Sequence, residues 1–239
     1  MDVGVQSVVF GDADLEAVLD SVERLDLDAV ELWGRHLSPA SPQSERQLVE
    51  WAEVSVAGYG VVDLEEPEDA AEHVRFADEI GAGYVTVNYP PTRDDITEEL
   101  VRLGAAHDID VAIHNYSSVH HDDLSSVFSS LEDVRTVLNE YEHPRLGVCI
   151  DTGHFLVMDE SPEEALETLG ERTIAVHLKD TSEAEIEDIP GAGALDLPRI
   201  AALLEEHTDL AYPPMIEYEL EYDAEETLRR AIENVRAAF

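Results

Sequence analysis

The segment Leu146-Gly147-Val148-Cys149-Ile150-Asp151-Thr152-Gly153-His154 joins a short apolar run to a polar cluster. Its first five residues have the continuous apolar character of a parallel strand that is buried on both faces. In a barrel of such strands, polar residues at the carboxyl ends converge on one mouth, where the active site lies. If the chain repeats this unit, its strand ends will carry the functional residues.

Apolar runs of this kind recur along the 239 residues, with amphipathic segments between them. The expected strands are Val3–Val8, Ala29–Trp33, Val54–Ala57, Tyr84–Val87, Asp110–His114, Leu146–Ile150, Ile174–Leu178 and Pro214–Glu217. The expected helices are Asp14–Leu25, Ser44–Glu50, Pro67–Ile80, Ile96–Ala106, Leu131–Tyr141, Pro162–Leu169, Leu197–Glu206 and Asp223–Ala238. Units of about 30 residues are typical of a βα repeat, so the pattern predicts a single (β/α)8 TIM barrel over residues 1–239. An open doubly wound sheet is the alternative, but Phe10-Gly11-Asp12 stands where its Gly-rich phosphate loop would follow the first strand.

The composition excludes several classes of partner. The chain carries 55 Asp and Glu against 14 Lys and Arg, a formal net charge of −41. Such a surface repels nucleic acid and anionic lipid, so we expect neither as a partner. The acidity and the near-complete loss of lysine are typical of halophilic proteins, because molar salt screens self-repulsion. We expect a cytoplasmic protein, since no apolar run is long enough to span a membrane, no signal peptide is evident and the one cysteine cannot form an internal disulfide.

Four consecutive expected strands end in residues that can bind a metal: His114, Asp151, His177 and Glu217. Taken singly, each is more simply a packing residue or a helix cap. Their equivalent positions on adjacent strands favour a shared metal site instead. Two imidazoles and two carboxylates suit one divalent ion, whether Mn²⁺, Zn²⁺, Co²⁺, Fe²⁺ or, less well, Mg²⁺.

Other residues near these strand ends are candidates for binding substrate. Lys179, the only lysine, follows His177 by two residues and would lie on the same face; a structural ion pair is its alternative role. His154, which we expect in the loop after the sixth strand, binds substrate or a second metal, or else caps a helix. Glu31 and His36, near the end of the second strand, either form a substrate wall or belong to the core and surface.

Four segments carry a resemblance to a known family: 111–115 (VAIHN), 146–154 (LGVCIDTGH), 175–180 (AVHLKD) and 215–219 (MIEYE). They resemble the sugar phosphate isomerase/epimerase branch of the xylose isomerase-like barrel superfamily. The resemblance implies one divalent metal held by His114, Asp151, His177 and Glu217. Epimerases of that family carry Glu at the fifth-strand position and use it with the eighth-strand Glu as opposed acid and base; His114 departs from that pattern.

The resemblance implies an isomerase or epimerase that acts on a sugar, polyol or sugar phosphate through an enediolate, by proton transfer beside a metal-bound carbonyl. Glu217 is the expected base, and His114 is a ligand or the opposing acid. A lyase acting on a keto-sugar and a non-catalytic sugar-binding barrel remain alternatives. An apurinic-site endonuclease is less favoured, because such enzymes need further zinc ligands on the early strands. A homo-oligomer is left open.

Overall fold

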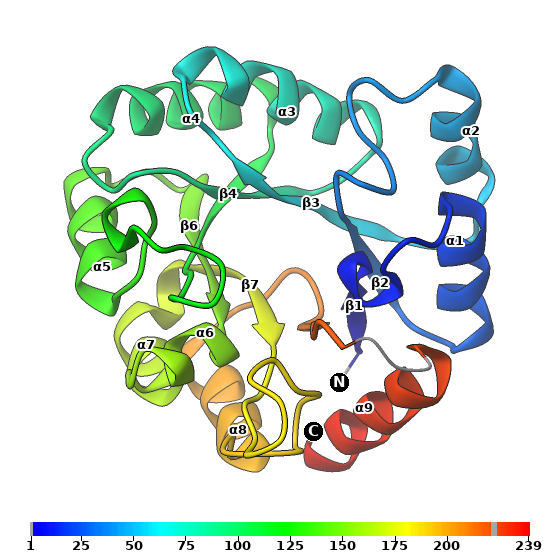
Figure 1. Cartoon of the computed structure of the whole chain (residues 1–239). Helices are drawn as coiled ribbons and strands as arrows, with labels where there is room; N and C mark the ends of the chain where they lie inside the picture. The colour runs from blue at the N-terminus through cyan, green and yellow to red at the C-terminus, as the bar shows by residue number, and fades with distance from the viewer. Residues whose placement is uncertain (1, 221–223) are drawn as a thin grey trace.

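Eight parallel strands close into a barrel in the computed structural model, which describes residues 2–220 and 224–239 (Figure 1). Each strand pairs with the next along the chain, and β1 closes the ring against β8. The strands are β1 (Gly4–Gln6), β2 (Ala29–Leu32), β3 (Val56–Asp63), β4 (Tyr84–Asn88), β5 (Asp110–His114), β6 (Leu146–Asp151), β7 (Thr173–Leu178) and β8 (Met215–Ile216). The predicted (β/α)8 barrel is confirmed, and the doubly wound sheet is excluded.

Helices surround the barrel (Figure 1). They are α1 (Leu15–Arg24), α2 (Gln43–Trp51), α3 (Pro67–Glu79), α4 (Asp94–His107), α5 (Leu131–Glu140), α6 (Thr152–Val157), α7 (Pro162–Leu169), α8 (Leu197–His207) and α9 (Ala224–Ala238). Acidic and hydroxyl caps start several of them: Asp14 accepts a hydrogen bond from the Ala17 amide, and Ser161 accepts one from the Glu164 amide. Strong caps fix where each helix begins and therefore how long the preceding mouth loop is.

The barrel interior is filled by one buried apolar layer. Each strand from β2 to β8 contributes one residue to it: Ala29, Ala57, Tyr84, Ala112, Cys149, Ala175 and Met215. Because side chains on a strand alternate between faces, the residue two positions later also points into the barrel, nearer the mouth. On or just after six of these strands that residue is polar and buried: Glu31, Thr86, His114, Asp151, His177 and Glu217. The apolar layer thus forms the floor on which a polar layer rests.

The structure differs from the predicted elements in four places. β1 stops at Gln6, because a 3₁₀ turn takes up Ser7–Phe10, and β3 runs six residues beyond the expected end at Ala57. His154 lies in the short helix α6 rather than in a loop. The expected start of the last helix, Asp223, lies outside the described residues, and α9 is described from Ala224.

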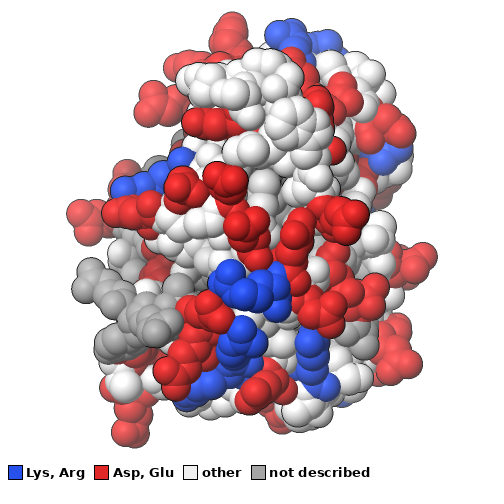
Figure 2. Space-filling model, turned by 90° about the vertical axis from the view of Figure 1, so that its right-hand side faces the viewer, with Lys and Arg blue, Asp and Glu red and all other residues white. Residues whose placement is uncertain are grey.

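Acidic side chains are spread over the face that Figure 2 shows, and basic side chains lie among them. Glu225 of α9 bridges Arg24 of α1 and Arg229, with N–O distances of 2.7 Å to each. Exposed pairs of this kind contribute only about 0–1 kcal/mol each. No helix within the described ranges combines the length and hydropathy needed to cross a bilayer.

Candidate metal and substrate site

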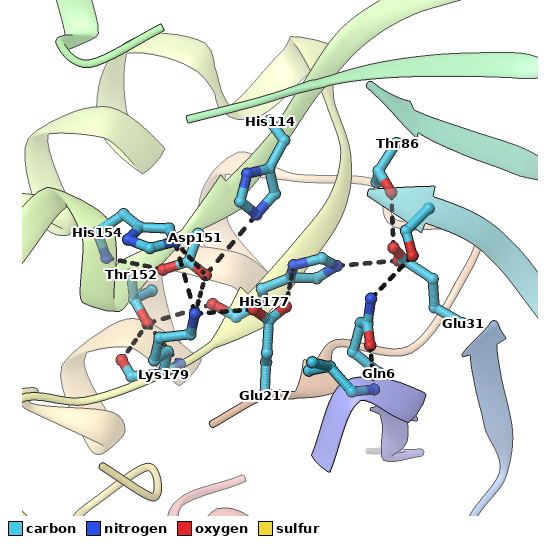
Figure 3. A network of polar contacts seen from close by, with 12 residues as sticks. Gln6, Glu31, Thr86, His114, Asp151, Thr152, His154, His177, Lys179 and Glu217 are labelled. Atoms are coloured by element: carbon cyan, nitrogen blue, oxygen red, sulfur yellow. Dashed lines mark hydrogen bonds and ion pairs between the residues drawn. The ribbon is translucent and has the colours of Figure 1, made fainter. Parts of the chain in front are cut away.

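Four side chains at the carboxyl ends of β5 to β8 converge on one point in the barrel mouth (Figure 3). His114, Asp151, His177 and Glu217 each offer a ligand atom, and these atoms all lie within 4.8 Å of one another. His114 Nε2 is 3.7 Å from Asp151 Oδ2, and His177 Nδ1 is 2.5 Å from Glu217 Oε2. The four residues predicted as metal ligands are therefore brought together.

Their facing atoms lack ordinary hydrogen bonds. Among the described residues, few buried side-chain polar atoms have no hydrogen-bond partner, and most of these belong to the cluster: both ring nitrogens of His114, Asp151 Oδ2, His177 Nδ1 and Glu217 Oε2. Unsatisfied buried polar atoms are costly and rare in native proteins. One such atom from each of the four residues is accounted for if a cation binds there, and the mixed nitrogen and oxygen donors fit a divalent transition metal. The donor set contains no thiolate, unlike most structural zinc sites.

Glu31 fixes the orientation of His177. Its carboxylate is fully buried and accepts hydrogen bonds from Tyr84 Oη (2.7 Å) and Thr86 Oγ1 (2.6 Å). It also lies 2.9 Å from His177 Nε2. Burial opposes ionisation of Glu31, but the positive charge and hydrogen bond of His177 and the bonds from Thr86 and Tyr84 together lower its pKa. A carboxylate on Nε2 leaves Nδ1 facing the cluster as a ligand atom, which is the usual arrangement behind a metal-bound histidine.

Lys179 neutralises the carboxylates of the site. Its ammonium lies 2.8 Å from Glu217 Oε1, 3.0 Å from Glu187 Oε1 and 3.5 Å from Asp151 Oδ2. Burial would lower the pKa of Lys179, but these three carboxylates raise it well above its usual value. The side chain passes directly over Gly153, where a Cβ would lie 2.6 Å from Lys179 Cγ. A glycine at position 153 is therefore needed for the buried lysine to reach the cluster.

Asp151 and Glu217 stay ionised in this environment. Burial is the largest single influence and raises the pKa of each carboxyl group, but the Lys179 ammonium and the neighbouring charged and hydrogen-bonding groups together outweigh it. The pKa of both therefore lies below the usual range. Ionised carboxylates are what a divalent ion requires as ligands.

His154 is held at the edge of the cluster by the start of α6. Asp151 Oδ1 caps that helix by accepting from the His154 amide at 2.7 Å, while Oδ2 faces the other ligands. The His154 ring lies 2.9 Å from Ser117 Oγ through Nδ1 and 3.5 Å from Lys179 through Nε2. Burial lowers the pKa of His154 to about 3, so its ring is neutral.

The long connection between β7 and α8 carries Glu187 into the site. Asp180, directly after Lys179, is fully buried and accepts from the backbone amides of Gly191, Gly193 and Leu195. A Cβ at Gly193 would lie 1.8 Å from Thr181 O, so this return of the chain requires glycine. The anchored loop then places Glu187 against Lys179.

A cavity of about 290 Å³ opens above the cluster. Its lining comes from the carboxyl ends of β1, β2, β3 and β8 or just beyond them, from the loop after β5 and from helix α6: Gln6, Val8, Trp33, Val61, Asp63, Tyr116, His120, His121, His154, Glu217 and Glu219. His120 reaches across the mouth, with Nε2 at 2.9 Å from Glu187 Oε1 and 3.5 Å from Glu219 Oε1. The cavity is large enough for a small polyhydroxylated molecule beside the cluster.

Two of the predicted substrate-binding residues lie behind the site. The lining includes neither Glu31, whose carboxylate is enclosed by its three donors, nor His36. The His36 ring contacts Ser7 Oγ at 2.9 Å and Gly11 O at 3.0 Å. In this structure both residues brace the walls of the mouth.

Sequence reasoning missed Asp63 and Glu187 as residues of the site, and it gave Glu219 only as a second-choice metal ligand after Glu217. Asp63 is the last residue of β3, six residues beyond the predicted end of that strand at Ala57. Glu187 is placed by the long loop between β7 and α8. The period-two spacing from Glu217 to Glu219 was the one available signal.

Residues 19–238 match the family model of the xylose isomerase-like TIM barrel. No curated protein matches the chain in sequence. Among solved structures, the 3-keto-D-glucoside 4-epimerase YcjR of E. coli aligns with a TM-score of 0.79 at 14% identity, over 99% of both chains. The IolI protein with a bound zinc atom aligns with a TM-score of 0.77 at 15% identity, over 100% of this chain and 96% of that one. The probable 3-DHS dehydratase AsbF of Bacillus anthracis aligns with a TM-score of 0.77 at 13% identity, over 99% of both. At these identities the likeness shows a shared fold.

Proposed function

Because this chain belongs to the xylose isomerase-like TIM barrel family, we propose that it is a divalent-metal-dependent isomerase or epimerase of a small sugar or polyol. Its structural neighbours include a sugar epimerase and a zinc-binding barrel protein. The observation that carries the proposal is the cluster of buried polar atoms without a hydrogen-bond partner on His114, Asp151, His177 and Glu217. When bound, a divalent ion supplies Lewis acidity that makes a proton next to a carbonyl more acidic.

Glu217 is the proton-accepting residue in this proposal. It lines the cavity, and its carboxylate is held ionised by Lys179 and His177 although it is buried. Lys179 bonds Oε1 and His177 contacts Oε2, so the carboxylate has one orientation relative to the cavity. An oriented, ionised carboxylate beside the reacting carbon is a suitable general base.

Neutral His154 and the mouth side chains bind the substrate. A neutral imidazole can donate or accept a hydrogen bond, as hydroxyl groups require. Lys179 is a positioning residue here, because it is fully buried and fully engaged with carboxylates.

His114 in place of a fifth-strand carboxylate favours reactions with a single carboxylate base. Aldose–ketose isomerisation and β-elimination from a keto-sugar both begin with one proton removal, and both fit Glu217 acting alone. Two-base epimerisation instead requires His114 to act as the opposing acid. His114 lies opposite Asp151 at the cluster, 4.7 Å from the Tyr116 ring between centroids.

The test is exchange of solvent deuterium into bound sugar. Purified protein loaded with Mn²⁺ is incubated in D₂O with a panel of ketoses and aldoses, and the label is read by NMR and mass spectrometry. We expect exchange at the carbon next to the carbonyl for at least one sugar, and its loss in Glu217→Gln. Undiminished exchange in a Glu217→Gln protein that still holds its metal would show that another residue is the base. No exchange with any sugar would contradict the isomerase proposal.

A further inference from the structure

The cavity above the cluster is lined by acidic side chains without a basic counterpart. Asp63, Glu217 and Glu219 line it, and within the described parts of the chain no Lys or Arg does. Asp63 is exposed and bonds Asn88 through Oδ1, and Glu219 is 40% exposed. A substrate entering this mouth meets two accessible carboxylates before it reaches the cluster.

The buried ammonium of Lys179, which lies near the cavity, is already paired with carboxylates. Lys179 is 1% exposed and lies among Asp151, Glu187 and Glu217. Three carboxylates therefore surround this one ammonium. A phosphate oxygen would have to displace one of these carboxylates to bind Lys179.

Arginines in the neighbouring loops are also engaged. Arg93 donates to Glu66 and to both oxygens of Asp95, at 2.8 Å each. Arg35 pairs with Asp12. Neither arginine lines the cavity. No free guanidinium among these residues is positioned to hold an anionic substituent.

The lining histidines do not supply the missing charge. Burial lowers the pKa of His121, and the His154 ring is already engaged by Ser117 Oγ and Lys179 Nζ. The hydrogen bond to Glu187 raises the pKa of His120, but its ring is already paired with Glu187 and faces Glu219 at 3.5 Å. Any positive charge on His120 is therefore matched by adjacent carboxylates.

Helix N-termini, which bind phosphate in many barrels, are closed by acidic caps here. Asp14 caps α1, Asp151 caps α6 and Asp196 caps α8, each accepting from a backbone amide of the first turn. At α3, Glu66 and Asp69 form a reciprocal capping box. At the N-termini of these four helices, α1, α3, α6 and α8, a carboxylate thus already occupies a backbone donor that a phosphate would need.

We propose that this mouth selects uncharged sugars and rejects phosphorylated or carboxylated ones, with Asp63 and Glu219 as the specificity-determining residues. This inference rests on the proposed function, since it concerns the substrate class of the same site. The remaining lining suits a neutral ring or chain: Trp33, Val8 and Val61 are apolar, while Gln6 and Tyr116 are polar. A sugar matches this lining with its apolar C–H faces and hydroxyl edges, whereas the phosphate group of a sugar phosphate would meet no lysine or arginine in it.

Equilibrium binding tests the proposal apart from turnover. Isothermal titration of Mn²⁺-loaded protein uses D-fructose, D-psicose and D-xylulose, the corresponding 6- or 5-phosphates, and inorganic phosphate. Two like charges at the mouth predict that each phosphate ester binds on the order of tenfold or more weakly than its free sugar. The double variant Asp63→Asn/Glu219→Gln should narrow this ratio by about tenfold. Glu50→Gln, which removes an exposed charge from the outer helix α2, is the matched control and should leave the ratio unchanged.

The outcomes separate this inference from the proposed function. Phosphate esters binding as tightly as the free sugars, or no free sugar binding at all, would overturn the selectivity. If the double variant leaves the ratio of the two Kd values unchanged, Asp63 and Glu219 do not determine the selectivity. Free sugars that bind selectively but exchange no deuterium would leave the selectivity standing and refute the catalytic proposal.

Discussion

Replacing Glu31 by Gln should weaken metal binding although Glu31 lies outside the four-residue cluster. In the native chain the Glu31 carboxylate accepts from Tyr84, Thr86 and His177 while fully buried. A glutamine keeps one oxygen, which can still face His177 Nε2, and its amide can turn to the Thr86 hydroxyl. The Glu31→Gln variant therefore keeps a hydrogen bond from His177, but the acceptor of that bond is no longer charged.

The expected magnitude follows from that difference. A hydrogen bond to a charged group contributes about 1.5–3 kcal/mol, against about 1 kcal/mol for a neutral one. Losing about 1.4 kcal/mol corresponds to a tenfold higher Kd for the metal, within the 10–100-fold range for partners of metal-bound histidines. Glu31→Ala removes the bond as well and should approach the hundredfold end.

Competition against a chromophoric chelator measures the Kd of Zn²⁺ for the native chain and for both variants. Glu16→Gln, an exposed change in the first turn of α1, is the control and should leave the Kd unaltered. Thermal unfolding of the metal-free proteins separates a change in affinity from a change in folding. A Glu31→Gln protein that folds and binds Zn²⁺ within twofold of the native Kd would refute the orienting role of Glu31.

Further predictions concern the base, the buried cation and the mouth. Glu217→Gln should fold and lose deuterium exchange by at least a hundredfold, measured by NMR, since an amide cannot accept the proton. Lys179→Met should lower the free energy of unfolding of the metal-free chain by about 3–5 kcal/mol in denaturant titration, because it leaves buried carboxylates unneutralised; no change would contradict the neutralising role. Gly153→Ala should cost about 1–3 kcal/mol by overpacking against Lys179, with Gly153→Ser at least as severe. The stability difference between the native chain and His120→Gln should be largest between about pH 4.3 and 6.5. It should shrink below that window as Glu187, whose pKa is lowered, becomes protonated, and above it as His120, whose pKa is raised, loses its proton. A difference independent of pH would show that this pair adds no stability.

The barrel and the convergence of the four candidate ligands could be predicted because both follow from strand periodicity. Apolar runs of nearly constant spacing predict the strands. The polar residue that ends each run is then expected to point into the barrel mouth, provided that the end of the strand is predicted correctly. For β5 to β8 this condition held: Ala112, Cys149, Ala175 and Met215 form the floor, and the ligands lie two residues further on each strand. Period-two alternation is enough to build that layer.

The second and third strands show where such reasoning stops. β3 continues past its predicted end at Ala57 and includes Gly58 and Gly60. Glycine is a weak strand former, so the sequence pattern does not indicate this extension. In the structure these glycines make room for partners on β4: a Cβ would lie 2.2 Å from Tyr84 at Gly58 and 2.0 Å from Thr86 Oγ1 at Gly60. Tyr84 and Thr86 in turn hold Glu31. This packing is not visible in a single sequence.

Residues brought in by loops could not be predicted either. Glu187 reaches Lys179 because the Asp180 carboxylate accepts hydrogen bonds from backbone amides of the same loop and so fixes its path. No periodicity in the sequence predicts such a loop conformation. That the single lysine needs carboxylate partners in a buried position was inferable, but the sequence offers many acidic residues and does not say which one lies nearest.

The content of bound metal per chain, measured by elemental analysis on native protein and on Asp151→Asn, tests the central claim most directly. Asn keeps an oxygen to cap α6 through the His154 amide while replacing the Oδ2 ligand atom by a nitrogen that cannot coordinate. The account predicts about one divalent ion per native chain and its loss in the variant. Two or three zinc ions per chain would point to phosphodiester hydrolysis, and native protein that binds no divalent ion even when one is added would contradict the account.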